Sequence, residues 1–92
     1  MMLSVYAYKD NALGCYTTPF FDDRPSENVG IGVARAIIAS EKKSSMKHKV
    51  LYKIGTYDDA KGSITPCEPE LILDCDEVLA RVGSENAETK NS

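Results

Sequence analysis

The segment VLYKIGTYDDAKGSIT, which runs from Val50 to Thr65, says most about the fold of this chain. Its first half is rich in β-branched and aromatic residues, which favour a strand. The DDAKG stretch that follows has the composition of a four- or five-residue turn with a glycine at a left-handed position, and β-prone residues then return. The segment therefore predicts a β-hairpin. Because proline cannot donate to a ladder, Pro66 and Pro69 predict that the returning strand is short or lies at a sheet edge.

A second β-hairpin is expected near the N-terminus. From Met2 to Tyr8 the residues alternate with period two, the pattern that places one set of side chains on each face of a strand. The KDNA stretch that follows has turn chemistry, since Asp and Asn bond their own backbone. β-prone residues resume from Gly14 to Phe20, so the two segments are expected to pair.

One amphipathic helix is expected between the hairpins. Pro25, followed by Ser26 and Glu27, is typical of a helix start, with an acid near the positive end of the dipole. Gly30 and Gly32 each weaken a helix by up to about 1 kcal/mol relative to Ala, which indicates either close packing against another backbone or a frayed first turn. Apolar residues at helical spacing form a stripe broad enough to cover a sheet: Val29, Ile31, Val33, Ala34, Ala36, Ile37 and Ile38.

A short second helix is expected near the C-terminus. Asp74, with Glu77 three residues later, resembles a capping box, and Gly83 is a typical helix stop. Residues 84–92 have no large apolar side chain and are expected to be disordered. We therefore predict a single α+β domain over residues 1–83.

The predicted domain is a small antiparallel sheet of four or five short strands, formed by two β-hairpins, with one amphipathic helix packed on a face. The lysine-rich stretch from Ser40 to Lys49 is expected to be a mobile connection between the helix and the second hairpin. One sheet face stays thinly covered in this arrangement. We expect that face either to dimerise or to receive a ligand.

The composition argues against secretion, membrane insertion and metal binding. The apolar runs fall far short of the roughly 20 residues needed to cross a bilayer, and the N-terminus reads as a strand rather than a secretion signal. Cys15, Cys67 and Cys75 are odd in number, far apart and include no C-x-x-C pair, so neither a disulfide framework nor a zinc site is expected. The single His48 is too little for a His-rich metal site. A reducing compartment fits best.

No catalytic apparatus or cofactor site is expected. The G-x-G in the VGIGVA stretch lacks the third glycine of a dinucleotide site. Asp58 and Asp59 are ordinary turn formers, and Cys15 and Cys75 have no base beyond the one histidine. The chain is therefore predicted not to be an enzyme.

The pattern with most functional content is a basic stretch beside strand tyrosines. The net charge is −3, yet residues 42–53 hold five lysines and no acid. Aromatic rings on a sheet face with lysines at its rim can stack bases and neutralise phosphates, as proteins that hold single strands do. Such tyrosines can also be half-buried core residues, and such lysines solvated loop residues. The candidate nucleic-acid-binding residues are Lys42, Lys43, Lys47, Lys49, Lys53, Tyr6, Tyr8 and Tyr52, within a wider set that includes Tyr16 and Tyr57.

Four motifs together span most of the part of the chain that is expected to be ordered. They are VYAYKD from Val5, TPFF from Thr18, RPSEN from Arg24 and LYKIGTYDDAKGSI from Leu51. Through them the chain resembles the small nonstructural protein of gokushovirus-type microviruses, phages with circular single-stranded DNA genomes. The resemblance implies a protein of the host cytoplasm that is absent from the virion and acts in single-stranded DNA synthesis or packaging. It supplies no catalytic residues.

Two function hypotheses follow. In the first, a non-enzymatic phage accessory protein binds single-stranded DNA or the replication complex and supports genome synthesis or packaging. In the second, a protein-interaction module, which could be a homodimer, engages a host or phage protein without touching nucleic acid. The segregated lysines favour the first hypothesis, and the net acidity of the chain favours the second.

Overall fold

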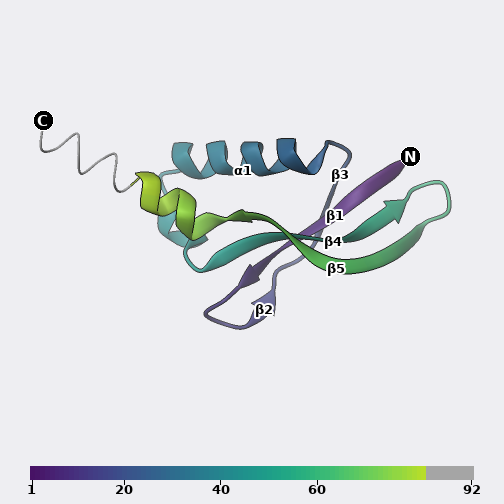
Figure 1. Cartoon of the computed structure of the whole chain (residues 1–92), viewed down its shortest axis with the longest axis horizontal. Helices are drawn as coiled ribbons and strands as arrows, with labels where there is room; N and C mark the ends of the chain where they lie inside the picture. Colours follow the sequence, from purple (N-terminus) through teal and green to yellow (C-terminus); the bar gives the residue numbers. More distant parts are fainter. Residues whose placement is uncertain (83–92) are drawn as a thin grey trace, which may run out of the picture.

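A computed structural model describes residues 1–82 as a five-stranded antiparallel sheet with helices (Figure 1). This is the α+β fold expected from the sequence. The predicted helix stop at Gly83 and the predicted disorder of residues 84–92 lie outside the described residues. The elements in chain order are β1 Met2–Asp10, β2 Cys15–Tyr16, β3 Phe20–Asp22, α1 Ser26–Ala39, the 3₁₀ turn η1 Lys43–Met46, β4 Lys49–Asp58, β5 Ser63–Asp74 and a helix over residues 75–82.

The hairpin predicted from Val50 to Thr65 is confirmed, and β4 and β5 are its two strands. Its turn is closed by the backbone N–H of Gly62, which donates to the carbonyl of Asp58 at 2.7 Å. Gly62 has φ +66°, the left-handed conformation that glycine adopts without strain. The Asp58 carboxylate accepts a further bond from the N–H of Ala60, as expected of a turn-forming aspartate.

Of the two alternatives predicted for the returning strand, a short strand or a place at the sheet edge, the second is the one that applies. β5 is 12 residues long and ends the strand order β2-β1-β4-β5. Its register against β4 shifts twice, and these irregularities let the strand pass Pro66 and Pro69 without losing its partner. At one shift Gly55 is essential, because a Cβ there would lie 2.7 Å from the carbonyl oxygen of Thr65.

The N-terminal hairpin is confirmed in outline, but its second strand is split. β2 and β3 both pair antiparallel with β1, on the edge opposite β4. Thr17 continues the pairing between them, since its N–H donates to the carbonyl of Tyr8 at 2.7 Å. Pro19, which has no N–H to donate, lies in the interval before β3 begins.

The helix α1 lies along one face of the sheet (Figure 1). Val29 and Ile37 are buried beneath it, but Ile31 and Ile38 are 45% and 53% exposed, so the buried stripe is narrower than the sequence predicted. Gly30 is buried as well, and a Cβ on it would lie 3.2 Å from Cγ2 of Ile72. Of the two explanations for this glycine, close packing is therefore the one that applies.

Two clusters form the core between the sheet and the helices. The first is built on Tyr6, Val29 and Leu51, with Phe20 and Ile72 packed against them. The second closes the other end of α1, where Cys75 and Val78 of the C-terminal helix meet Ile37. The Asp74 carboxylate begins that helix by accepting the N–H of Asp76 at 3.0 Å, as an N-cap aspartate does. In the described residues, the reciprocal hydrogen bond from Glu77 that a capping box would add is absent.

Candidate nucleic-acid interface

The sheet face opposite α1 carries four aromatic rings. Leu3, Val5, Ala7 and Lys9 alternate along β1 and so share one face of the sheet. Residues that pair directly across strands also share a face, and these four pair with Tyr57, Phe21, Tyr52 and Tyr16, respectively. We call this surface the open face; Ile64 and Leu71 of β5 extend it, since they pair with Tyr57 and Tyr52.

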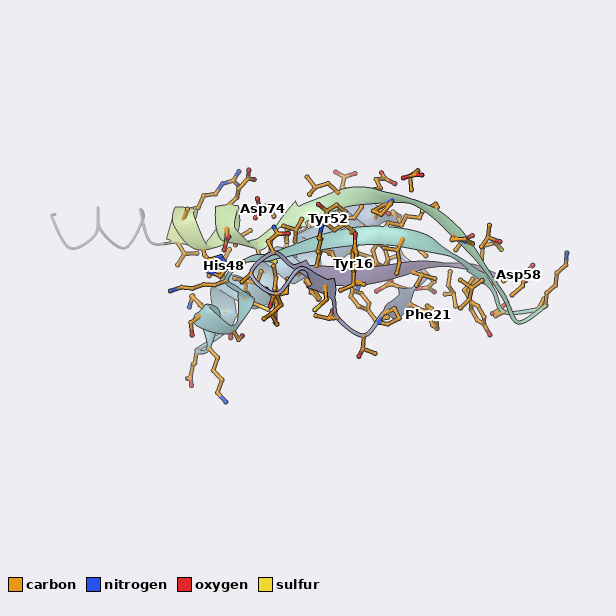
Figure 2. All side chains as sticks on the ribbon, turned by 90° about the horizontal axis from the view of Figure 1, so that it is seen from below. Tyr16, Phe21, His48, Tyr52, Asp58 and Asp74 are labelled. Carbon is orange, nitrogen blue, oxygen red and sulfur yellow. The ribbon has the colours of Figure 1, made fainter. Side chains whose placement is uncertain are left out.

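The four rings of the open face form two pairs. Phe21 and Tyr57 are stacked, with ring centroids 5.1 Å apart and planes inclined by 11°. Tyr16 and Tyr52 meet edge to face, with centroids 6.1 Å apart. Figure 2 views the sheet from this side and labels three of the four. Phe21 and Tyr16 are 47% and 44% exposed, so their rings are available to a ligand.

Small residues form the floor between the ring pairs. Val5 and Ala7 are 3% and 1% exposed although none of the helices in residues 1–82 covers this side of the sheet. Gly55, which pairs with Val5, is buried too. The large rings on the neighbouring strands shield these positions from solvent. On the open face the aromatic side chains therefore project outward, and the small residues between them are buried.

Lys9 supplies positive charge to the open face. Its Nζ lies over the ring of Tyr16, 5.9 Å from the centroid, within the range of a cation–π interaction. This contact holds an ammonium group beside an exposed ring, and proteins that bind single strands combine positive charge with aromatic rings in this way.

The structure separates the predicted tyrosines into two groups. Tyr52 lies on the open face, whereas Tyr6 and Tyr8 point to the side covered by α1. Tyr6 is fully buried, and its hydroxyl shares a 2.9 Å hydrogen bond with that of Ser26. Burial raises the pKa of the half-buried Tyr8 hydroxyl, with a smaller contribution from Cys75. A ligand on the open face would therefore meet Tyr52 but neither of the other two.

The five predicted lysines do not form one patch. Lys42, Lys43 and Lys47 lie in and beside η1, which packs against the end of α1 through Met46. The ammonium group of Lys43 already makes one hydrogen bond within the protein, because its Nζ donates to the carbonyl of Ser40 at 2.7 Å.

The other two predicted lysines, Lys49 and Lys53, are strand residues of β4. Lys49 stands opposite Asp10, and Lys53 stands between Tyr6 and Glu70. Neither shares the open face with the rings, so Lys9 is the lysine that the structure adds to the predicted set.

Phe21 is the aromatic residue of the open face that the sequence analysis missed. The signal was present in the TPFF motif, because two successive aromatic residues on a strand point to opposite faces. Phe20 packs into the core against Tyr6 and Tyr8, with ring centroids 5.5 and 6.0 Å away. Phe21 must then project from the open face.

The cysteines and the histidine are not part of the two ring pairs of the open face. All three cysteines are free; Cys15 and Cys67 are exposed and Cys75 is buried. His48 has φ +65°, and its N–H donates to the Asp76 carboxylate at 2.9 Å, so it fixes the start of β4 against the C-terminal helix. Within residues 1–82, no group of three or more His, Cys, Asp or Glu side chains is arranged to hold a metal ion.

In the described part of the chain, no helix is both long and apolar enough to span a membrane.

Comparison with known proteins gives one match. Searches of curated proteins and of solved structures found no match. The family described as phage ORF5 protein matches residues 3–78, a span that includes α1 and all of the sheet except Met2. The chain therefore belongs to the phage ORF5 protein family.

Proposed function

We propose that this phage protein binds single-stranded DNA on its open face and supports genome synthesis or packaging. It acts without catalysis, in the host cytoplasm, for a microvirus of the gokushovirus type. The observation that carries the proposal is the set of four aromatic rings on the sheet face that α1 leaves uncovered. The resemblance to nonstructural proteins of single-stranded DNA phages and the membership of a phage family support it.

The ring pairs suit unpaired bases rather than a duplex. Every base has a π face, and stacking on a protein ring contributes about 1–3 kcal/mol per base without demanding a particular sequence. The pairs stand at Leu3–Val5 and at Ala7–Lys9 of β1. An offset of four strand residues corresponds to about 13 Å, so one strand of DNA must extend across several nucleotides to reach both pairs. Stacked bases in a duplex offer no free faces at that spacing.

The electrostatics predict an affinity that depends more on stacking than on charge. Lys9 is held against a ring of the open face, whereas Lys42 and Lys47 lie at η1, where they can meet the phosphates of a strand that runs past the sheet. The net charge of −3 opposes a polyanion at long range. Because each neutralised phosphate adds about 0.7 to the salt slope for single strands, few contacts mean a shallow slope.

The proposal is tested by fluorescence anisotropy with a labelled single-stranded oligonucleotide and a duplex of the same sequence. We expect the single strand to bind more tightly. Tyr52→Ala should weaken binding by about tenfold, the equivalent of one lost stacking contact, while Tyr52→Phe keeps the ring and the affinity. Ile38→Ala, which truncates an exposed side chain on α1, is the matched control. The absence of single-strand binding at low salt, or equal losses in Tyr52→Ala and Ile38→Ala, would refute the proposal.

A second candidate function is supported by the apolar content of the same surface. Phe21, Ile64 and Leu71 are 47%, 58% and 60% exposed, which is unusual for side chains of this size on one face. A protein-interaction module, here a homodimer, would cover them without nucleic acid. Sedimentation separates the two functions: a dimer that Phe21→Glu dissociates, together with no DNA binding, would support the second. Reversible competition between dimer and DNA would support the first.

A further inference from the structure

The outer edge of β5 is exposed beside a groove. β5 pairs with β4 along one edge, and it is the last strand of the sheet in the described part of the chain. Its residues from Ser63 to Leu71 are all exposed. A cavity of about 370 Å³ lies between α1 and the end of this strand that leads to the C-terminal helix. An edge strand next to a helix and a groove is the geometry that accepts an extended peptide as an added strand.

The groove is apolar with an acidic rim. Gly30, Ala34 and Ile72 supply small or apolar surface, and Ile31, which is 45% exposed, forms the wall on the α1 side. Two charged residues line the groove, and both are acids: Glu27 of α1 and Glu70 of β5. The lining contains no lysine or arginine. The lining therefore favours an apolar side chain flanked by positive charge.

The prolines limit where a new strand can pair. Pro66 and Pro69 have no N–H to donate, so the edge is interrupted on the hairpin side of Glu70. The stretch from Glu70 to Asp74 is free of proline, and its residues from Glu70 to Leu73 line the groove. The backbone and the groove thus select the same short segment.

We propose that an extended, lysine- or arginine-bearing segment of a partner protein adds as a strand to β5 between Glu70 and Asp74 and places an apolar side chain in the groove. Backbone hydrogen bonds hold the segment, while the groove and the two acids select its side chains. A second copy of this chain fits less well, because its own β5 brings Glu68 and Glu70 against the same acids. The groove shares Leu71 with the open face but contains none of its four rings, so DNA binding on those rings does not depend on the groove.

The test selects binders to the full-length protein from a display library of short random peptides. We expect the selected peptides to share basic residues around a β-branched or other apolar residue. Labelled synthetic copies should lose about tenfold in affinity for Glu70→Lys and for Ile31→Ser. Glu68→Lys, on the same strand between the prolines, and Ile38→Ser, on the same helix, are matched controls that should keep binding. Backbone NMR shifts on peptide addition should concentrate at residues 27–34 and 70–74.

Three results would overturn the proposal. The first is a library that yields no peptide, or peptides without basic residues. The second is equal loss of affinity in the Glu70 and Glu68 variants, which would place the binding elsewhere. The third is a dimer of the free protein that Ile31→Ser dissociates, since a second copy would then occupy the groove. Single-stranded DNA affinity should be the same in all four variants, so a failure of this site leaves the open-face proposal standing.

Discussion

At the scale of single residues, two glycines of this chain stand where another backbone or side chain approaches closely. Gly55 of β4 leaves room for the carbonyl of Thr65, and Gly30 of α1 leaves room for Ile72. Both approaches are made by β5, which is why the glycines could not be explained from the local sequence. The sequence offered two readings of Gly30, and the choice between them needed the position of a strand about 40 residues further along.

Two glycine substitutions are predicted to change stability in opposite directions. Gly55→Ala should lower the free energy of unfolding by about 1–3 kcal/mol, because a Cβ at 2.7 Å from a backbone oxygen forces β4 and β5 apart. Gly32→Ala should raise it by up to about 1 kcal/mol, since alanine favours the helix and its Cβ would lie 3.6 Å from the nearest atom of Arg24. Urea denaturation measures both. A Gly55→Ala protein as stable as the wild type would contradict the register of the hairpin.

The cysteines are predicted to differ in reactivity. Burial raises the pKa of the Cys75 thiol to about 11, and the neighbouring carboxylates of Asp74 and Asp76 add to the effect. The native protein treated with iodoacetamide at about pH 8 should therefore be alkylated at Cys15 and Cys67 and protected at Cys75, whereas urea should expose all three. Peptide mass spectrometry identifies the sites. Rapid alkylation of native Cys75 would mean that the C-terminal helix does not dock as described.

The same thiol gives a pH dependence of stability. Its pKa in the folded protein lies above the ordinary value, so the neutral form is the one that folding favours. The contribution is complete below the ordinary thiol pKa and is lost as the pH rises toward about 11. Cys75→Ser should remove this alkaline dependence.

At the scale of elements, α1 is fixed to the sheet at both ends by different means. At its start the Tyr6 hydroxyl bonds to Ser26, and at its end Ile37 packs on Cys75 and Val78. The chain enters α1 through Arg24, whose guanidinium forms a bidentate pair with Asp22 of β3 at distances of 2.6 to 3.2 Å. The junction between β3 and α1 is thus ordered by residues that do not belong to the core.

Tyr6→Phe tests whether the buried Tyr6 contributes to stability alone or also to DNA binding. The substitution removes the hydrogen bond to Ser26 and should cost about 0.5–1.5 kcal/mol of stability. Affinity for single-stranded DNA should not change, because Tyr6 is fully buried on the α1 side. Thermal unfolding and anisotropy on the same sample give the two values. A large loss of DNA affinity with unchanged stability would place the binding site under α1 instead.

The junction before α1 is predicted to respond to acid. The hydrogen bonds from the Arg24 guanidinium, followed by that from its backbone N–H, lower the pKa of the Asp22 carboxyl. A carboxyl whose folded pKa is depressed stabilises the protein above its ordinary pKa of about 4, and the contribution disappears as the pH falls through the lower folded value. Asp22→Asn should therefore lower the Tm at neutral pH and match the wild type in strong acid. A pH-independent difference would contradict the ion pair.

The elements differ in how far the sequence predicted them. Both hairpins and α1 follow local signals: alternation, turn residues and a helix start after Pro25. The length of β5 does not follow from local signals. Pairing with β4 across two irregularities overrides the break that Pro66 and Pro69 indicate locally. The split of the N-terminal hairpin into β2 and β3 likewise depends on pairing along β1, which a propensity pattern does not contain.

At the scale of the whole molecule, the decisive feature is that α1 covers one face of the sheet (Figure 1), while the opposite face carries the two pairs of aromatic rings. The sequence correctly indicated strand tyrosines and a thinly covered face. It did not say which tyrosines would share that face, since alternation groups Tyr6 with Tyr8 but does not say which side the helix takes. Phe21 and Lys9 entered the candidate site, and Tyr6 and Tyr8 left it, only when the register of β1 with its neighbours was known.

The two proposed sites lie on opposite sides of the sheet, so DNA binding and partner binding can be tested separately. The open face carries four rings and one lysine for the proposed single strand, while the groove beside β5 is apolar with two acids for the proposed basic segment. A phage accessory protein that holds single-stranded DNA and a protein partner at the same time would link the genome to the machinery that copies or packages it.

The most direct test of the open-face site is intrinsic tyrosine fluorescence, because the chain has five tyrosines and no tryptophan. Titration with a single-stranded oligonucleotide should quench the part of the emission that comes from Tyr16, Tyr52 and Tyr57, as bases stack on their rings. The variant with Tyr16→Ala and Tyr52→Ala together should bind weakly and show little quenching. Saturable quenching that these substitutions abolish is the predicted result; no quenching, or equal quenching in the variant and the wild type, would contradict the site.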